Sequence, residues 1–192
     1  MAGGKKRLSE TVTLAGKALS IRAPQPGDEA AMARFAAAVP VHDLMFLARD
    51  IRQPKVLGAW LAAQASGEIA SFIALDGDGV AATVAAHSDR LSWSAHVWDI
   101  RLLVAPEWRS KGLGRRLLER AVAAAIAAGA TRLTARMTPD QAGAITLFEE
   151  TGFRAEALLR GQLRDADGKM HDLAVLAMDP GAQAARRGAF GE

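Results

Sequence analysis

At residues 102–114 the chain reads Leu102-Leu103-Val104-Ala105-Pro106-Glu107-Trp108-Arg109-Ser110-Lys111-Gly112-Leu113-Gly114. An apolar strand ends in this stretch, a short basic loop follows, and a helix begins at two glycines separated by one residue. The start of a helix presents unpaired backbone N–H groups and the positive end of its dipole, so it attracts phosphate oxygens. Glycines let a bulky diphosphate approach the backbone, and the arginines and lysine nearby add positive charge. The stretch therefore predicts a diphosphate-binding site.

Two other phosphate-binding loops do not fit this stretch. A P-loop needs four residues between its glycines and then Lys followed by Ser or Thr, which are absent here. A Rossmann turn needs a third glycine three positions after Gly114, where the chain has Leu117, and a first glycine directly after the strand. An ordinary loop whose glycines only cap the helix stays open as an alternative.

The elements around this stretch predict a sheet flanked by helices. Asp28 is expected to cap the first helix, and Asp76-Gly77-Asp78-Gly79 predicts a hairpin. The long helix after residue 112 predicts a parallel crossover, so the order of elements indicates an α/β or α+β fold with antiparallel hairpins. Strands are expected at residues 20–23, 69–75, 80–86, 95–104, 133–137, 155–163 and 173–178. Helices are expected at 28–38, after the loop at 39–43, and at 55–65, 113–128 and 139–150.

The chain resembles the GNAT superfamily of acyl-CoA-dependent N-acyltransferases in two blocks. The first block of the family is a strand ending in Val-x-Pro and then Arg/Gln-x-x-Gly-x-Gly/Ala, matched by Val104-Ala105-Pro106 and Arg109–Gly114. The second is a polar residue followed by Ala-Ile-x-Leu-Tyr-Glu-x-x-Gly-Phe, matched within Asp140–Phe153 except that Phe148 replaces the tyrosine. The order of elements agrees over about residues 19–179, with some similarity to bacterial protein-lysine acetyltransferases.

The resemblance implies a GNAT-like acyl-CoA N-acyltransferase fold, in which a mixed, mostly antiparallel sheet of about seven strands has a central parallel pair that splays apart. It also implies acetyl-coenzyme A as cofactor. The pantetheine arm would lie between the splayed strands and pair with backbone near Leu103 and Val104, where an N–H would polarise the thioester carbonyl. The residues expected to bind the cofactor are Leu103, Val104, Arg109, Ser110, Lys111, Gly112, Leu113, Gly114, Arg115, Gln141 and Phe148.

Acetyl transfer to a primary amine by direct attack on the thioester needs a base, because a free lysine-type amine has a pKa of about 10.4. Asp99 is the candidate, since it lies five residues before Val104, the spacing of a catalytic Glu in the related lysine acetyltransferases. The alternative is that Asp99 only pairs with Arg101 on the sheet surface. Trp98 and Ile100, where other branches of the superfamily carry the base, cannot accept a proton.

Phe148 stands where the family usually carries the tyrosine that protonates the departing thiolate, and the chain contains no tyrosine. A thiol with a pKa of about 8.5 is a tolerable leaving group without protonation. General-acid help is typically worth about 10²–10⁴-fold in rate. We therefore expect either a slow enzyme or one that uses water or the hydroxyl of Thr146 or Thr151.

His42 and Asp43 lie between the early helices, where the family builds its acceptor pocket, and are candidate acceptor contacts. A plain loop role for His42 stays open. Asp43 and Asp50 are expected to be able to hold a cationic amine. No histidine has metal-ligand spacing and the chain has no cysteine, so no metal site is expected.

Composition and length limit the number of domains, the cellular compartment and the kind of partner. The chain has 192 residues, a net charge of +3 and no cysteine, which fits one cytoplasmic domain. We expect an N-terminal lead-in over residues 1–18, the acetyltransferase domain over 19–179 and a flexible C-terminal tail over 180–192. The expected partner is a small-molecule or protein amine, with no nucleic acid and no membrane, and a homodimer stays open. The alternative function is a non-catalytic acyl-CoA-binding or sensing module.

Overall fold

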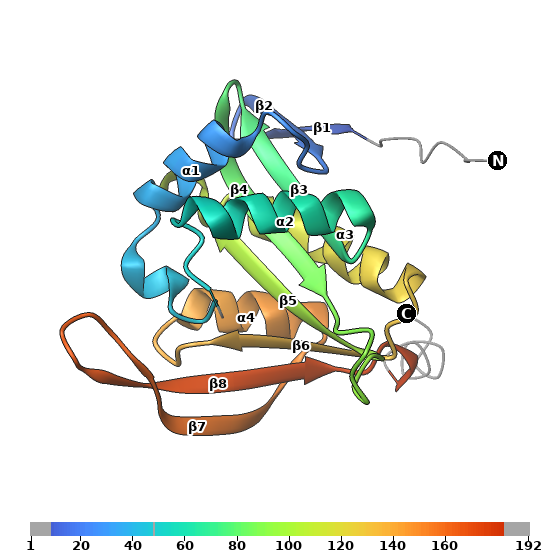
Figure 1. Cartoon of the computed structure of the whole chain (residues 1–192), viewed down its shortest axis with the longest axis vertical. Helices are drawn as coiled ribbons and strands as arrows, with labels where there is room; N and C mark the ends of the chain where they lie inside the picture. The colour runs from blue at the N-terminus through green and yellow to red at the C-terminus, as the bar shows by residue number, and fades with distance from the viewer. Residues whose placement is uncertain (1–8, 48, 183–192) are drawn as a thin grey trace.

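One eight-stranded sheet runs through the computed structural model, which describes residues 9–47 and 49–182 (Figure 1). Its strand order is β1-β2-β3-β4-β5-β6-β8-β7. Neighbouring strands are antiparallel except β5 and β6, which run parallel, so the predicted mixed, mostly antiparallel fold is confirmed. The strands are β1 (Glu10–Leu14), β2 (Lys17–Arg22), β3 (Ile69–Asp76), β4 (Gly79–His87), β5 (Val97–Val104), β6 (Arg132–Met137), β7 (Arg154–Arg164) and β8 (Met170–Met178).

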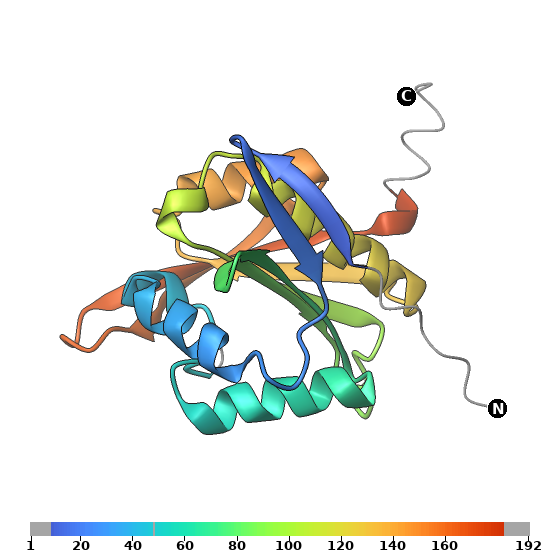
Figure 2. The same ribbon diagram turned by 90° about the horizontal axis from the view of Figure 1, so that it is seen from above.

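Helices cover both faces of the sheet. Figure 2 shows α1 and α2 on one face and α3 and α4 on the other. Among the described residues, no helix combines the length and the hydropathy needed to cross a membrane. The helices are α1 (Glu29–Ala38), the 3-10 helix η1 (Val41–Leu44), α2 (Pro54–Ser66), the 3-10 helix η2 (Pro106–Trp108), α3 (Leu113–Ala127) and α4 (Ala142–Thr151).

The first strand lies in the segment expected to be a lead-in. β1 pairs with β2 through a turn at Ala15 and Gly16, which have φ values of 49° and 77°. The sheet therefore has eight strands instead of about seven, and the first of them lies within residues 1–18. The alternation of side chains along β1, which buries Val12, was the available signal. Residues 1–8 and 183–192, where most of the expected tails fall, lie outside the described residues.

β5 and β6 pair only near their beginnings. Residues Val97–Ile100 pair with Arg132–Ala135, whereas β5 continues to Val104 and β6 to Met137 without further pairing between them. On its other side β5 stays paired with β4 as far as Val104. From Arg101 onward, β5 therefore has a backbone edge without a strand partner on the side of β6.

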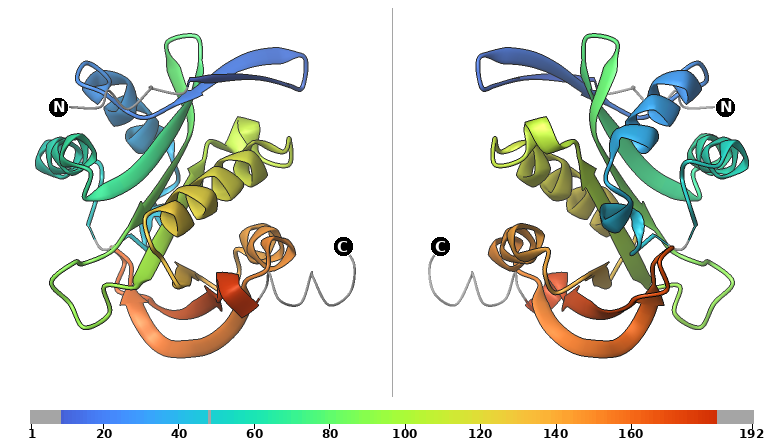
Figure 3. Two further views of the ribbon diagram at one scale, coloured as in Figure 1. Left: turned by 90° about the vertical axis from the view of Figure 1, so that its right-hand side faces the viewer. Right: turned by 90° about the vertical axis from the view of Figure 1, so that its left-hand side faces the viewer.

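α3 packs across β4 and β5 on one face of the sheet, as Figure 3 shows. Because the helix is anchored over β5, its first turn comes directly beyond the end of that strand, with η2 and a short loop between them. This packing places the glycine-bearing helix start beside the free edge of β5. The side chains of α3 that are fully buried are Leu113, Leu117, Leu118, Ala121 and Ala125.

Asp28 does not cap α1 with its side chain, in contrast to the expectation. Its carboxylate accepts two hydrogen bonds from Arg22, each of 2.7 Å, and one of 2.8 Å from the backbone N–H of Gln25. The bidentate guanidinium contact is stronger than a bond to a helix N–H, which explains why Asp28 faces Arg22. The hydrogen bond from Arg22 also lowers the pKa of the Asp28 carboxyl below its ordinary value. The pair joins the end of β2 to the start of α1.

We expect Asp28→Asn to lower the free energy of unfolding at pH 7 by about 1–3 kcal/mol, because it removes the anionic partner of Arg22. A carboxyl whose pKa is lowered on folding contributes fully above its unfolded value of about 3.9, and this contribution is lost as the pH falls through the folded value. Urea denaturation should therefore show that the advantage of the wild type shrinks between pH 7 and pH 3. Equal stability of the two proteins at pH 7 would contradict this role.

Candidate active site

A cavity of about 660 Å³ opens where β5 and β6 separate. Its walls come from the second half of β5, the loop after it, the start of α3, the end of β6 and the first turns of α4, while η1 contributes from the N-terminal part of the chain. Lys111 and Leu113 do not line it, because Lys111 Nζ lies 5.2 Å from the ring centroid of Trp108 and Leu113 is buried in the core. The other residues expected to bind the cofactor do line it: Leu103, Val104, Arg109, Ser110, Gly112, Gly114, Arg115, Gln141 and Phe148.

The start of α3 leaves its backbone N–H groups open toward this cavity. Gly112 is the N-cap residue and has a φ of 82°, a left-handed conformation that favours glycine. Among the described residues, no side chain caps the helix and no acid lies in its first turn. The first N–H groups of a helix have no acceptor within the helix, so this end suits an anion.

Gly114 lines the cavity and also serves packing. A Cβ added at Gly114 would lie 3.1 Å from Leu147 Cδ2 and 3.4 Å from Val104 Cγ2. At Gly112 the nearest atom would be Leu14 Cδ2 at 3.8 Å, which is ordinary contact. The two glycines therefore have different tasks: Gly112 permits the turn into the helix, and Gly114 permits α3 to approach α4 and β5.

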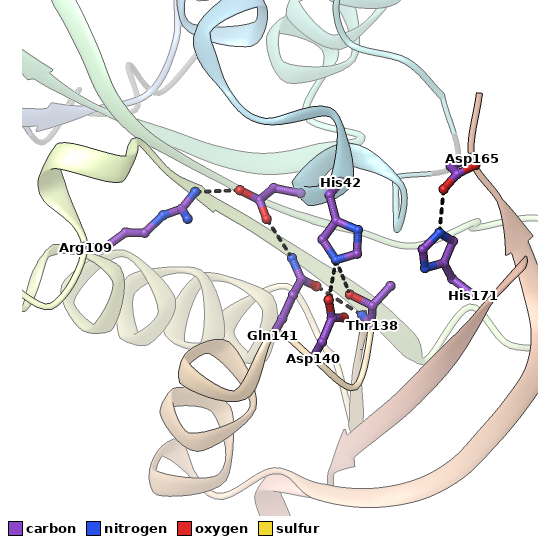
Figure 4. Close-up of polar contacts among 8 residues, drawn as sticks. His42, Arg109, Thr138, Asp140, Gln141, Asp165 and His171 are labelled. Atoms are coloured by element: carbon purple, nitrogen blue, oxygen red, sulfur yellow. Dashed lines mark hydrogen bonds and ion pairs between the residues drawn. The ribbon is translucent and has the colours of Figure 1, made fainter. Parts of the chain in front are cut away.

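Asp43 connects the two sides of the cavity mouth. Its carboxylate accepts a hydrogen bond of 2.6 Å from Arg109 Nη2, which follows β5, and one of 3.3 Å from Gln141 Nε2, which precedes α4 (Figure 4). The carboxylate is thus already paired with a guanidinium, and Asp50 likewise pairs with Arg52 at 2.8 Å. The expectation that Asp43 and Asp50 hold a cationic amine is therefore not supported by these contacts.

His42 joins η1 to the loop after β6. Its Nε2 lies 2.9 Å from Asp140 Oδ2 and 3.1 Å from Thr138 Oγ1 (Figure 4). The hydrogen bond from Thr138, and to a lesser degree His42, lowers the pKa of the Asp140 carboxyl, which is ionised at neutral pH. An ionised carboxylate accepts, so Nε2 carries the proton and Nδ1 of a neutral ring is the acceptor. Thr138 and Asp140 are not among the predicted site residues; their place directly after a strand is the signal that points to them.

The hairpin of β7 and β8 reaches the same side of the cavity. The ring of His171 lies 5.6 Å from that of His42 in an edge-to-face arrangement. His171 Nε2 lies 2.7 Å from Asp165 Oδ2, and this contact lowers the pKa of the Asp165 carboxyl (Figure 4). Asp165 and the residues after it form the predicted turn of this hairpin. Three segments distant in sequence therefore meet around His42.

Asp99 lies on the face of β5 that is turned away from α3, and it does not line the cavity. Its Oδ2 accepts a hydrogen bond of 2.9 Å from Arg101 Nε, so the pairing that the sequence leaves open is present. Its Oδ1 lies 3.3 Å from Thr134 Oγ1 and 3.9 Å from Arg136 Nε. His87 Nε2 lies 3.1 Å from Arg101 Nη2, and burial together with the charge of Arg101 lowers the pKa of His87, which is therefore neutral at neutral pH.

Comparison with known proteins identifies the family. A sequence profile of the Acetyltransferase (GNAT) family matches residues 34–153. The chain belongs to the GNAT acetyltransferase family. It is an acetyl-CoA-dependent N-acetyltransferase that acts on an amine acceptor. A search of curated protein sequences finds no match.

Solved structures share the fold of this GNAT acetyltransferase. A GNAT acetyltransferase from Streptococcus pneumoniae has a TM-score of 0.73 at 24% identity, covering 84% of this chain and 99% of the other. The ribosomal-protein-S5-alanine acetyltransferase of Vibrio fischeri has 0.74 at 15%, with coverage of 90% and 96%. A phosphinothricin acetyltransferase from Sinorhizobium meliloti in complex with acetyl-CoA has 0.68 at 18%, with coverage of 88% and 89%. These likenesses establish the fold.

In this GNAT acetyltransferase, Phe148 lines the cavity from α4. Its side chain is buried and packs edge-to-face on Phe153, with ring centroids 5.0 Å apart. The two hydroxyls expected as substitutes for a tyrosine do not line the cavity: Thr146 is exposed, and Thr151 Oγ1 donates to the carbonyl of Leu147 at 2.9 Å. Water, Thr146 and Thr151 were the expected proton sources for the thiolate, and of these only water fits the contacts of the two threonines.

We expect Gly112→Leu to weaken coenzyme A binding at least tenfold, because the side chain would stand over the N–H groups of α3. Gly129→Leu is the matched control, since Gly129 also has a left-handed φ, of 96°, but lies beyond the far end of the helix. Each substitution should cost roughly 1–2 kcal/mol of stability from backbone strain. Calorimetric titration with coenzyme A and thermal denaturation measure the two effects. Equal binding by both variants would rule out a diphosphate at Gly112.

We expect Phe148→Tyr to raise kcat by about 10²-fold, because a hydroxyl at this wall can protonate the departing thiolate. The variant should also gain an alkaline limb in its pH–rate profile, since a tyrosine donates only while it is protonated. Phe46→Tyr adds the same hydroxyl at another wall of the cavity and should produce no such limb. Thiol release measured from pH 6 to pH 10 tests this. An unchanged rate and pH profile in Phe148→Tyr would show that the missing tyrosine does not limit protonation of the thiolate.

Proposed function

We propose that this GNAT acetyltransferase binds acetyl-coenzyme A in the cavity between β5 and β6 and that a primary amine attacks the thioester directly there. The observation that carries the proposal is the meeting of two features at one cavity: an edge of β5 without a strand partner, and a start of α3 without a capping side chain among the described residues. An extended amide-bearing arm pairs with a strand edge, and a diphosphate binds a helix start. Acetyl-coenzyme A has both groups, and its thioester supplies an electrophilic carbonyl.

In this proposal, backbone at Leu103 and Val104 holds the arm, while Arg109 and Arg115 hold the diphosphate. Both arginines already have acid partners, Asp43 for Arg109 and Glu150 for Arg115. The Arg115–Glu150 pair is exposed on both sides, at 44% and 52%, so it contributes little. In the other pair Asp43 is only 16% exposed, but the guanidinium of Arg109 is 45% exposed and can turn to a new partner. A diphosphate, with more charge than a carboxylate, can therefore replace these acids. When Arg109 turns to the diphosphate, the carboxylate of Asp43 becomes available on the acceptor side.

Two groups are candidates for the base that keeps the amine neutral. Asp99 has the spacing of the family's glutamate, but its carboxylate faces Arg101 and Arg136 away from the cavity, so it would act through water. His42 lines the cavity, and its contact with Asp140 leaves Nδ1 as the acceptor. We propose His42 as the group that accepts the proton directly, oriented by Asp140 as in other Asp–His pairs, and keep Asp99 as the alternative.

The acceptor is proposed as a primary amine of a small molecule or a protein. Fold relatives are named for both kinds, ribosomal-protein S5 alanine and phosphinothricin. A cytoplasmic location is part of the proposal and rests on the cysteine-free sequence. A homodimer is also proposed, with β7 as the contact, since this outermost strand exposes Leu158 at 47% and Leu159 at 40%. The mass in solution tests it: a monomer at all concentrations excludes the dimer.

We expect His42→Gln to lower kcat by about 10²–10⁴-fold and to abolish the acidic limb of the pH–rate profile, because glutamine keeps a hydrogen bond but accepts no proton. Asp99→Asn should retain that limb. His96→Gln, at an exposed histidine away from the cavity, is the matched control and should behave as wild type. The assay is thiol release from acetyl-coenzyme A with a panel of amines. A limb lost only in Asp99→Asn would assign the base to Asp99 instead.

A further inference from the structure

A second cavity, of about 380 Å³, lies between α2 and the face of the sheet opposite α3; we call it the α2 cavity. Its walls are mostly apolar, with Ile51, Val56 and Trp60 on the helical side and Leu103 on the sheet. The indole N–H of Trp60 is satisfied by Ser71 Oγ at 3.0 Å. The helical wall therefore presents a largely apolar surface to whatever enters.

The α2 cavity adjoins the proposed cofactor cavity. Leu103 of β5 lines both, and the neighbouring residues Phe46 and Leu47 line one each. Alternate residues of β5 point to opposite faces, so Arg101 reaches the α2 cavity from the same strand that offers its edge to the cofactor. A ligand in the α2 cavity thus lies one side-chain layer from the place where the proposed function puts the thioester.

The polar groups of the α2 cavity carry an excess of positive charge. Arg49 lines it and has no ion-pair or hydrogen-bond partner among the described residues. Arg101 donates from Nε to Asp99 and from Nη2 to His87, and its Nη1 has no acceptor within the described part of the chain. His87 is uncharged and Asp99 already pairs with Arg101, so no carboxylate lining the cavity compensates Arg49. An anionic ligand would restore neutrality and satisfy the remaining donors.

We propose that the α2 cavity binds the acceptor, and that the acceptor is a small primary amine with an apolar body and a carboxylate, of the kind of an apolar amino acid. The carboxylate contacts Arg49 and Arg101, the apolar body packs on Val56 and Trp60, and the amine points past Leu103. This inference rests on the proposed function of the neighbouring cavity. In the reaction, the amine nitrogen bonds to the acetyl carbon and the C–S bond breaks. The electron pair of the C–S bond leaves with the sulfur, which then gains a proton. The amine nitrogen loses a proton to the base.

The test compares acids with their amides. We expect wild-type protein to acetylate L-leucine and L-phenylalanine with a higher kcat/KM than leucinamide and phenylalaninamide. Arg49→Ala should lower kcat/KM for the acids by about ten- to a hundredfold, the range for a hydrogen bond to a charged group, and leave the amides unchanged. Arg52→Ala is the matched control, because Arg52 lies three residues away, pairs with Asp50 and does not line the α2 cavity. It should leave both classes unchanged.

A binding measurement separates this inference from the catalytic proposal. Calorimetric titration of coenzyme A-loaded protein with 4-methylpentanoate, which is leucine without its amine, should give binding that Arg49→Ala and Arg101→Gln each weaken. Binding without acetylation of any amine would support the α2 cavity as a carboxylate site and defeat the proposed function. Acetylation of amides or lysine peptides in preference to the acids, or no binding of the carboxylate, would overturn the α2 cavity proposal and leave the proposed function intact.

Discussion

The parallel pairing of β5 and β6 ends at Ile100 and Ala135, and the rest of the structure is arranged around this ending. Each strand continues with a different partner: β5 stays with β4 up to Val104, and β6 stays with β8 up to Met137. Twist between neighbouring strands separates the two pairs, so an edge appears in the middle of a sheet. An exposed strand edge offers unpaired N–H and C=O groups, which proteins usually cover. Here α3, α4 and η1 enclose it as a cavity instead.

The start of α3 has to meet two demands at once. The chain must turn into the helix directly after the loop that follows η2, which Gly112 allows through its left-handed φ. The helix must also lie close to β5 and α4, which Gly114 allows because any side chain would press on Leu147 and Val104. Close packing brings the positive end of the helix to the cavity wall, where an anion gains most from it. Packing and charge are therefore satisfied by the same short segment.

The polar contacts of η1 close the mouth of the cavity with one ion pair and one hydrogen bond. Asp43 pairs with Arg109, and His42 donates a hydrogen bond to the carboxylate of Asp140. One member of each contact is exposed, Arg109 at 45% and Asp140 at 68%, so a more highly charged group can reach and replace the existing partner. The α2 cavity differs in this respect, because its arginines exceed its carboxylates. The two neighbouring cavities thus present different electrostatic conditions to their ligands.

Much of the fold was predictable because its signals are local. The hydrophobic period of α3, the turn residues of the hairpins and the glycines after Arg109 each act over a few neighbouring residues. β1 had such a signal too, in the alternation around Val12, although the segment was expected to be a lead-in. Asp28 shows the limit of local reasoning, because a cap residue was expected where a guanidinium from β2 competed for the same carboxylate.

By itself the sequence determined where most strands and helices lie and which loop carries the helix start suited to a diphosphate, since backbone conformation and hydrophobic period depend on adjacent residues. Only the tertiary structure decided which charges meet. Asp43 and Arg109 are 66 positions apart and His42 and Thr138 are 96 apart. No local preference specifies such pairs, because they depend on how separate elements pack on the two faces of one sheet. The family resemblance implied that β5 and β6 separate. The pairing between them ends at Ile100 because each strand continues beside its other neighbour.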